Sequence, residues 1–432
     1  MDSVRRPAAG PGPRACTPGY ARPAPGGTAR GAGVSSSDNG PVEIETFEAL
    51  LSEEGRQLLA EVRGLAPGAE LAVATRLRRA HRAELVSAAI GQERLRQRAA
   101  AKFGEDAGRM YFTPDGVEQA TRRSVADWRA RRFAQLGVRR LADLCGGIGG
   151  DAIALARAGI AVLAVDRDPL TCAVAAANAA ALGLAELIEV RCADVTQTAT
   201  EGFDAVFTDP ARRGSRGRIF DPESYSPPLS WAIGAGRSTR FGALKVAPGI
   251  PHEAVPEDAE AEWVSDGGDV KEAVLWFGTG AEQPHRATLL PGGHTLTGGR
   301  LPDPPAAPVG RYLYEPDGAV IRAHLVAEVA QLLGGATLLD PHIAYLTSDR
   351  LTPTPYASAY ELTDVLPFNV KKLKALLRER SVGTVVIKKR GFAVEPEELR
   401  RKLRPEGAHS ATVVLTRIGT TPMMLLGRPA GA

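Results

Sequence analysis

Residues 141–166, LADLCGGIGGDAIALARAGIAVLAVD, decide how this chain is expected to fold. The pattern predicts a strand (141–145), a glycine-rich turn (146–150), a helix (151–158) and a second strand that ends in Asp166. This order is the first half of a nucleotide-binding βαβ unit. The glycines let the backbone approach a ligand closely, and the helix N-terminus presents unpaired N–H groups. Asp166 follows at about twenty residues, the spacing of an acid that binds ribose hydroxyls.

The glycine run alone leaves the ligand open, because residues 147–152 also fit a loose dinucleotide pattern and NAD is an alternative. Three further acids favour S-adenosylmethionine (SAM). Asp143 lies in the strand before the glycines, Asp194 follows a third predicted strand, and Asp209 ends a fourth. SAM carries an amine and a sulfonium, so acids near the carboxyl ends of the strands suit it better than they suit an anionic pyrophosphate. The sequence therefore predicts SAM as the cofactor.

The motif DLCGGIGGD at 143–151 resembles class I SAM-dependent methyltransferases and is especially similar to the core of trimethylguanosine synthases. From about Phe103 onward the chain resembles a bacterial group that couples such a core to a C-terminal THUMP-like domain. The resemblance implies a doubly wound, Rossmann-like α/β core. The residues expected to bind SAM are Asp143, Cys145, Gly146, Gly147, Gly149, Asp166, Arg167, Asp194 and Thr113.

Thr113 is included among these residues because it lies in the segment MYFTP at 110–114. In trimethylguanosine-synthase-like enzymes a similar aromatic-Thr-Pro segment precedes the core and helps to close the SAM pocket. By this resemblance Phe112 and Thr113 are candidates for cofactor contact. The alternative is that the aromatic residue only packs a helix onto the sheet.

The acceptor of the methyl group is expected at Asp209 and Pro210, because ligands bind beyond the carboxyl ends of the strands. A carboxylate there could accept a hydrogen bond from an exocyclic amine and orient its lone pair against the methyl group. Amino-methyltransferases usually have Asp/Asn-Pro-Pro followed by an aromatic residue, whereas this chain has Ala211 and Arg212. Methylation of a base amine is therefore one reading, and another acceptor remains open.

Side chains near this motif give further candidates. Arg212 and Arg213 lie in a glycine-containing loop and are expected to neutralise phosphates, with a solvated loop as the alternative. Phe220, Tyr225 or Trp231 could stack on a target base; for Trp231, packing of a helix against the sheet is the simpler reading. The role of Lys245, at the end of a fifth predicted strand, is left open.

Length and composition limit the protein class. A chain of 432 residues with 44% hydrophobic residues predicts two or three domains with proper cores. No apolar run is long enough to span a bilayer, so no membrane association is expected. The net charge of +3 is mild, so nucleic-acid affinity must come from local patches. The cysteines lack metal-ligand spacing, which predicts no metal site and a reducing cytoplasm; they are Cys16, Cys145, Cys172 and Cys192.

The chain is expected to divide into four regions. Residues 1–40 are rich in Pro, Gly, Ala and Arg and predict a disordered tail. Residues 41–109 show helical periodicity and predict a small helical domain. Residues 110–300 predict the methyltransferase domain, with seven strands, interleaved helices and an antiparallel edge. A Pro- and Gly-rich linker (291–310) leads to a small α+β domain at 310–428.

The C-terminal region is expected to begin with a helix (319–333) and a looped connection from Leu339. A compact alternation of helices and strands follows. That alternation is αβαββ in order and ferredoxin-like in outline, with elements at 368–380, 383–388, 396–403, 411–417 and 422–426. The segments IKKRG (387–391) and PEELRRKL (396–403) resemble the THUMP-like domain.

Basic residues far outnumber acids between 371 and 404, which favours binding to an RNA backbone, with a solvated charged face as the alternative. Lys388, Lys389 and Arg390 end a strand and are the residues expected to bind RNA. THUMP domains capture RNA for an attached modifying domain, so the resemblance also implies RNA, either rRNA or tRNA, as the partner.

The sequence thus predicts a cytoplasmic SAM-dependent methyltransferase that modifies a nucleobase of RNA. One alternative is a methyltransferase of protein or of a small molecule, in which the basic C-terminal unit is structural. The other is a non-catalytic protein that binds SAM and RNA. The sequence does not indicate an oligomeric state.

Overall fold

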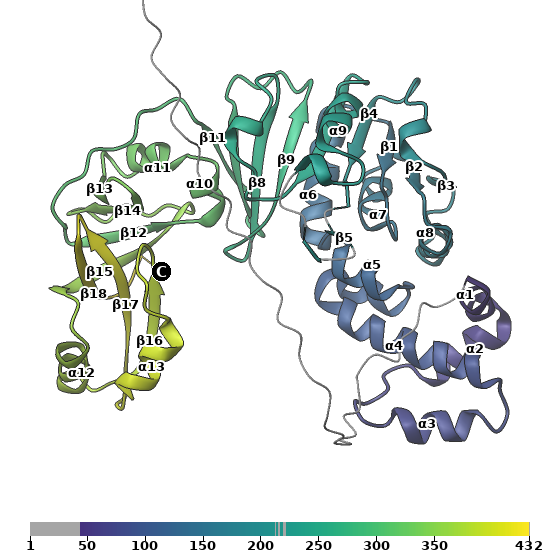
Figure 1. The fold of residues 1–432 in the computed structure, drawn as a ribbon, viewed down its shortest axis with the longest axis horizontal. Coiled ribbons are helices and arrows are strands. Elements are labelled where there is room, and N and C mark those ends of the chain that lie inside the picture. Colours follow the sequence, from purple (N-terminus) through teal and green to yellow (C-terminus); the bar gives the residue numbers. More distant parts are fainter. Residues whose placement is uncertain (1–43, 212, 215–216, 219–221, 432) are drawn as a thin grey trace, which may run out of the picture. The chain divides into compact units, whose positions relative to one another are not determined.

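The computed structural model describes residues 44–211, 213–214, 217–218 and 222–431 (Figure 1). The tail predicted at 1–40 lies outside these residues. The first described region is helical, as predicted, and its apolar residues Leu50, Leu58 and Leu59 are buried. Ser52 caps the second helix, since its hydroxyl accepts a hydrogen bond from the Gly55 N–H at 3.1 Å. The elements are α1 (Ile44–Leu51), α2 (Glu53–Glu61), α3 (Glu70–Leu77), α4 (Ala83–Phe103) and η1 (Gly104–Gly108).

The central part of the chain is the predicted doubly wound sheet with helices on its faces (Figure 1). Its strands lie in the order β11-β10-β8-β9-β7-β4-β1-β2-β3. The elements of this part are α5 (Pro114–Gln119), α6 (Arg123–Gln135), β1 (Arg140–Leu144), α7 (Gly150–Arg157), β2 (Ala161–Asp166), α8 (Pro169–Ala181), β3 (Ile188–Cys192), η2 (Val195–Gln197), β4 (Ala205–Thr208), β5 (Arg213–Gly214), β6 (Gly217–Arg218), η3 (Pro222–Ser224), α9 (Leu229–Gly236), β7 (Phe241–Val246), η4 (His252–Ala254), β8 (Glu260–Asp266), β9 (Asp269–Phe277), β10 (His285–Leu290) and β11 (His294–Gly298).

Parallel pairing brings the carboxyl ends of β1, β2, β3, β4 and β7 to one edge of the sheet. Residues 141–144 of β1 and all four residues of β4 are buried, as expected for strands covered on both faces. Beyond β7 the sheet includes the expected antiparallel pairing, because β9 runs antiparallel to both β7 and β8.

The sheet is longer than the expected seven strands. β10 pairs parallel with β8, and β11 pairs antiparallel with β10. The linker predicted at 291–310 is therefore wrong in part, because β11 lies within it. β11 is short, and its side chains do not alternate between apolar and polar in a clear pattern. Its hydrogen bonds to the edge of β10 define it as a strand, which is a long-range effect that local composition does not reveal.

The C-terminal part contains a second, seven-stranded sheet with the order β13-β14-β12-β15-β18-β17-β16. The αβαββ order predicted for its second half is confirmed. The elements are β12 (Tyr312–Pro316), α10 (Gly318–Arg322), α11 (Val326–Leu332), β13 (Thr337–Asp340), β14 (Ile343–Ser348), β15 (Ala357–Pro367), α12 (Val370–Glu379), β16 (Val382–Lys389), α13 (Pro396–Leu403), β17 (His409–Ile418) and β18 (Thr421–Ala430).

The loop predicted from Leu339 is wrong, because Leu339 and Asp340 end β13 and a tight turn leads directly into β14. Asp340 explains this turn: its carboxylate accepts a hydrogen bond from the His342 N–H at 2.9 Å. Such an Asx turn replaces a backbone turn and allows the two strands to pair. No helix in the described part of the chain is long and apolar enough to cross a membrane.

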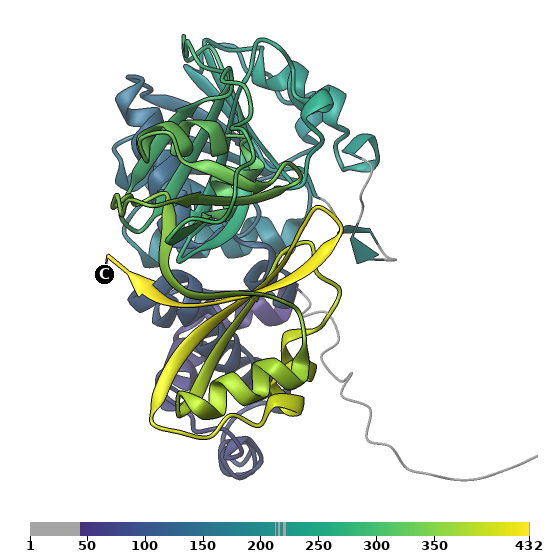
Figure 2. The ribbon, with the colours of Figure 1, turned by 90° about the vertical axis from the view of Figure 1, so that its left-hand side faces the viewer.

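Helices α12 and α13 pack side by side on one face of the C-terminal sheet (Figure 2). Each helix contributes a leucine pair to a shared core: Leu373 and Leu377 from α12, and Leu399 and Leu403 from α13. These leucines recur at a spacing of four residues, which places them on one face of each helix. The charged residues between them consequently face outward.

Candidate cofactor and acceptor site

The glycine-rich turn follows β1 as predicted and forms a loop of left-handed backbone. Cys145, Gly147 and Gly149 have φ values of 71°, 55° and 86°. The loop is fastened to β2, because the N–H groups of Cys145 and Gly146 both donate to the Val165 carbonyl, at 2.9 and 3.0 Å. A Cβ atom at Gly146 would lie 3.3 Å from the Asp143 carboxylate, so glycine lets the loop close over that side chain.

Asp143 lies beneath this loop, and its carboxyl group has no hydrogen-bonding partner in the described part of the chain. Its side chain is fully buried, and neither carboxylate oxygen has a hydrogen-bond partner among the described residues. Burial, together with the nearby carboxylates of Asp151 and Asp209, raises the pKa of Asp143 well above its usual range. A buried acid without a partner is costly unless a ligand compensates it. The cationic amine or sulfonium of SAM has the charge that this position lacks, so the residues present fit that cofactor.

Asp166 lies at the end of β2, adjacent to the loop. One of its oxygens accepts from the Gly147 N–H at 3.1 Å, and the other accepts from the Asp168 N–H at 3.1 Å. These bonds fix the carboxylate at the carboxyl edge of the sheet. Asp194 lies one strand further, after β3, and is exposed. Hydrogen bonds from the Thr196 N–H and hydroxyl, at 2.9 and 2.8 Å, lower its pKa.

The other predicted cofactor residues differ in their surroundings. The side chain of Cys145 is largely enclosed, and burial raises the pKa of its thiol, so it stays protonated. Arg167 is exposed, and its guanidinium lies 3.4 Å from the Ser226 hydroxyl. The Thr113 hydroxyl caps α5, because it accepts from the Gly116 N–H at 3.0 Å.

The segment before α5 is clamped to the core by side chains outside the predicted set of cofactor residues. The Asn178 carboxamide oxygen accepts from the Tyr111 N–H at 2.6 Å, and its nitrogen donates to the carbonyls of Tyr111 and Ile148 at 3.1 and 3.0 Å. Asn178 therefore joins the aromatic segment to the glycine loop and has a structural role.

Helix α4 holds the same segment from the other side. The Arg96 guanidinium donates to the Met110 carbonyl at 2.9 Å, and the Gln92 amide faces the backbone N–H and C=O of Phe112. The Phe112 ring is buried and lies 5.4 Å from the Phe103 ring, as expected of a packing anchor. No sequence pattern marks Gln92 or Arg96, because their partners are backbone atoms of a distant segment.

On the acceptor side, Asp209 follows β4 and its N–H contacts the Leu144 carbonyl of β1 at 3.3 Å. One carboxylate oxygen accepts from the Lys245 ammonium at 2.6 Å, and Lys245 also donates to the Thr121 hydroxyl at 2.9 Å. Lys245 is buried, whereas the side chain of Asp209 is 23% exposed. The other oxygen of Asp209 has no partner within the residues that the structure describes. The sequence left the role of Lys245 open, and the structure shows that it holds the Asp209 carboxylate.

The remaining residues of the acceptor motif are only partly described. Arg212 and Phe220 lie outside the described residues, and Arg213 is described only as part of β5. Ala211 forms a bridge with Ser226. Trp231 packs in α9 against the sheet, which agrees with the simpler reading of that residue.

A buried ionic network lies under the acceptor side, between α6 and the sheet. The Arg129 guanidinium is 2% exposed and is ion-paired with both Asp151 and Glu272. Burial outweighs these contacts at Glu272, so the pKa of its carboxyl is raised. Arg129 also lies 4.4 Å from the centre of the Phe207 ring. No spacing in the sequence indicates this network.

The predicted RNA-binding triplet has partners within the C-terminal domain. Lys388 is paired with Glu315 at 2.5 Å, and Lys389 with Glu395 at 2.5 Å. Arg390 lies 5.1 Å from the centre of the Tyr345 ring.

The fold and this site together define a SAM-dependent methyltransferase. A model of the RNA cap guanine-N2 methyltransferase family matches residues 138–216, a THUMP domain-like model matches 357–429, and a domain of unknown function matches 43–99. Two relatives from Mycobacterium tuberculosis, from strains CDC 1551 and H37Rv, are described as uncharacterized SAM-dependent methyltransferases. Each is 37% identical over 337 residues, 75% of this chain and 91% of the relative. The chain belongs to this family of SAM-dependent methyltransferases.

Solved structures agree on the fold. A protein from Porphyromonas gingivalis W83, assigned as a methyltransferase, superposes with a TM-score of 0.68 and 22% identity. The match covers 85% of this chain and 100% of that protein.

Proposed function

We propose that this methyltransferase modifies a nucleobase of RNA, with Asp209 and Pro210 holding the acceptor. Bound SAM supplies an electrophilic methyl group, and transfer to an amine is an in-line displacement that depends mainly on positioning. The observation that carries the proposal is the geometry of Asp209. Lys245 fixes one carboxylate oxygen at 2.6 Å, and the second is left to accept a hydrogen bond from an exocyclic amine.

The SAM site in this proposal lies along the carboxyl edge of β1, β2 and β3. Asp143 balances the positive charge of the cofactor, Asp166 binds the ribose hydroxyls, and Asp194 binds the adenine amine. The loop from Cys145 to Gly149 provides the close backbone approach. Arg167 and Thr113 complete the proposed set at its rim.

The RNA assignment is supported by the family models at both ends of the chain, because one describes an RNA methyltransferase and the other a THUMP-like domain. In this proposal the C-terminal domain docks the RNA, and Arg212 and Arg213 steer its phosphates at the active site. Lys388, Lys389 and Arg390 are proposed to contact the RNA, although Glu315 and Glu395 reduce the charge that the two lysines offer. We also propose a cytoplasmic location, since the described cysteines are free thiols.

The test is transfer of labelled methyl from SAM into the RNA, protein and small-molecule fractions of a cell extract, with the wild-type protein and Asp209→Ala. We expect label in RNA, and on the order of 100-fold less with the variant, because a misplaced acceptor loses about that factor. SAM affinity should be the same for both proteins. Label in protein or small molecules would contradict the RNA assignment. SAM binding without any transfer would favour a non-catalytic protein.

A further inference from the structure

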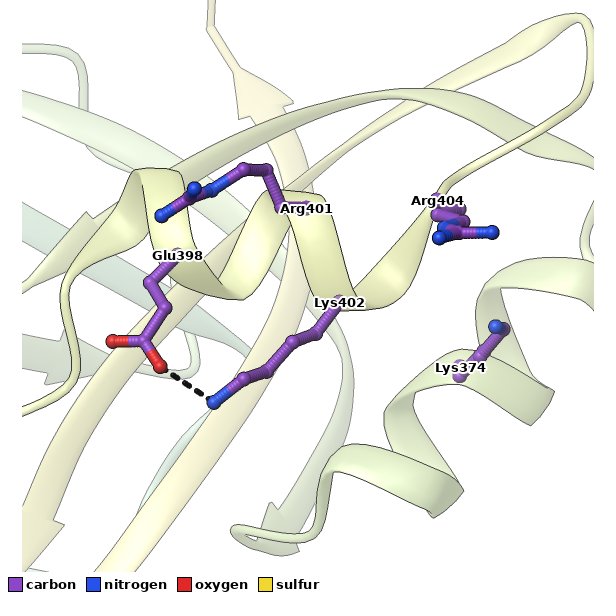
Figure 3. Close-up of a pocket in the computed structure, with 5 residues that line it drawn as sticks. All are labelled: Lys374, Glu398, Arg401, Lys402 and Arg404. Carbon is purple, nitrogen blue, oxygen red and sulfur yellow. Dashed lines mark hydrogen bonds and ion pairs between the residues drawn. The ribbon is translucent and has the colours of Figure 1, made fainter.

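An open hollow of about 530 Å³ lies between α12 and α13, and it is lined by charged side chains alone. Figure 3 shows these residues, which are Lys374, Glu398, Arg401, Lys402 and Arg404. No aromatic or aliphatic side chain lines the hollow, so it offers neither stacking for a base nor an apolar pocket. Its chemistry fits a hydrated anion that is recognised by charge.

Most of the positive charge at the hollow is not neutralised. Glu398 and Lys402 pair with each other at 2.6 Å, in the favourable i, i+4 order with the acid first. Lys374, Arg401 and Arg404 make no ion pair with any described residue. This distinguishes them from Lys388 and Lys389, which both have carboxylate partners.

The backbone at Arg404 is a second observation. Arg404 follows α13 in the left-handed conformation, with φ 45° and ψ 63°. Helices commonly end in this conformation with glycine, because a side chain there is strained. Arginine instead occupies the position, and Figure 3 shows its guanidinium at the gap between the helices, as it shows the Lys374 amine. Strain at one residue that also carries an unpaired charge points to a binding role.

The core fixes the spacing of these charges. Leu373 and Leu377 bury one face of α12, and Leu399 and Leu403 bury one face of α13. Both helices pack on β16, so the cations from the two helices meet in a fixed arrangement. The basic last turn of α13 also complements the helix dipole, but this effect does not involve Lys374 on the other helix.

We propose that this hollow binds phosphate groups of an RNA backbone and is the main docking contact of the C-terminal domain. The inference rests on the proposed function and specifies its docking surface. Because only charged groups line the hollow, it binds RNA independently of base sequence and leaves the choice of nucleotide to the acceptor site.

The test is the affinity of the full-length protein for single-stranded RNA of two unrelated sequences, measured at several salt concentrations. The variant Lys374→Gln/Arg401→Gln/Arg404→Gln should bind both RNAs at least tenfold more weakly near physiological salt. The slope of log affinity against log salt should fall by about 2, since each phosphate contact on a single strand contributes about 0.7. SAM affinity should not change.

A matched control removes the same charge elsewhere. The control residues Arg139, Arg140 and Arg240 are exposed. They lie where β1 and β7 of the nine-stranded sheet begin, at the edge opposite to the carboxyl ends of these strands. Their replacement by Gln should leave the RNA slope within about 0.5 of the wild type. The single variant Arg404→Gly should raise Tm, because glycine relieves the strain, and yet weaken RNA binding.

Three outcomes would overturn the inference. The first is an unchanged affinity and slope for the triple variant, while the wild type binds and methylates RNA. The second is an equal loss in both triple variants, which would indicate a general charge effect. The third is a wild-type preference for anionic vesicles over RNA. Absence of any RNA binding or methylation by the wild type would instead contradict the proposed function itself.

Discussion

At the scale of single residues, we propose that Asp143 links cofactor binding to pH. Its pKa is raised in the free protein because it is buried beside other acids. A cationic cofactor favours the charged form, so binding should release a proton. The folded pKa lies above the unfolded value, so the charged form costs stability. That cost is absent at a pH below the usual aspartate value and grows as the pH rises through the folded pKa.

We predict that SAM affinity rises with pH until Asp143 is ionised, and that Asp143→Asn removes most of this dependence. The variant should bind SAM at least tenfold more weakly at pH 7, because the charge partner is lost. The unliganded variant should be more stable by on the order of 1 kcal/mol, since it lacks the buried acid whose ionisation is favourable only in the unfolded chain. Calorimetry in two buffers of different ionisation enthalpy measures the released proton. A pH-independent affinity in the wild type would refute this role.

How far the site could be predicted differs from residue to residue. Asp143, Asp166 and Asp209 could be placed in advance, because each lies at or near the end of a predicted parallel strand and such ends share one edge. The contact between Lys245 and Asp209 could not, because it depends on the register of β7 beside β4. The contacts of Gln92 and Arg96 could not be predicted either, because their partners are backbone atoms and no residue spacing indicates them.

At the scale of elements, the attachment of α6 to the sheet depends on the buried Arg129, Asp151 and Glu272. We predict that Arg129→Met destabilises the protein by about 3–5 kcal/mol near pH 7, because two buried carboxylates lose their cation. The loss should be smaller at acid pH, where a protonated Glu272 needs no partner. Denaturant unfolding at two pH values measures both effects.

The double variant Arg129→Met/Glu272→Gln is the control for that prediction. It should recover part of the stability, because the uncompensated charge on Glu272 is removed. Equal stability of Arg129→Met and the wild type would show that the network contributes little.

Elements with a strong local pattern were predictable. The βαβ unit and the αβαββ alternation each have a repeating apolar face, and both formed as expected. β11 and the β13–β14 hairpin were not predicted, because they depend on pairing with a neighbouring edge and on one Asx turn at Asp340. Local propensity is weak evidence for such strands.

At the scale of the whole molecule, the chain combines a catalytic core with a domain that resembles a known RNA-docking module. In the proposed function, the core supplies the cofactor site and Asp209 positions the acceptor. The C-terminal domain supplies an exposed cluster of unpaired cations. If both proposals hold, base choice and affinity for the RNA backbone depend on different residues.

The most direct test of this account is the nucleoside composition of RNA from cells that lack the gene, measured by mass spectrometry. We predict that one methylated nucleoside is missing or strongly reduced. The wild-type gene should restore it, and a gene encoding Asp209→Ala should not. An unchanged set of methylated nucleosides in every RNA fraction would contradict the claim that this protein methylates RNA.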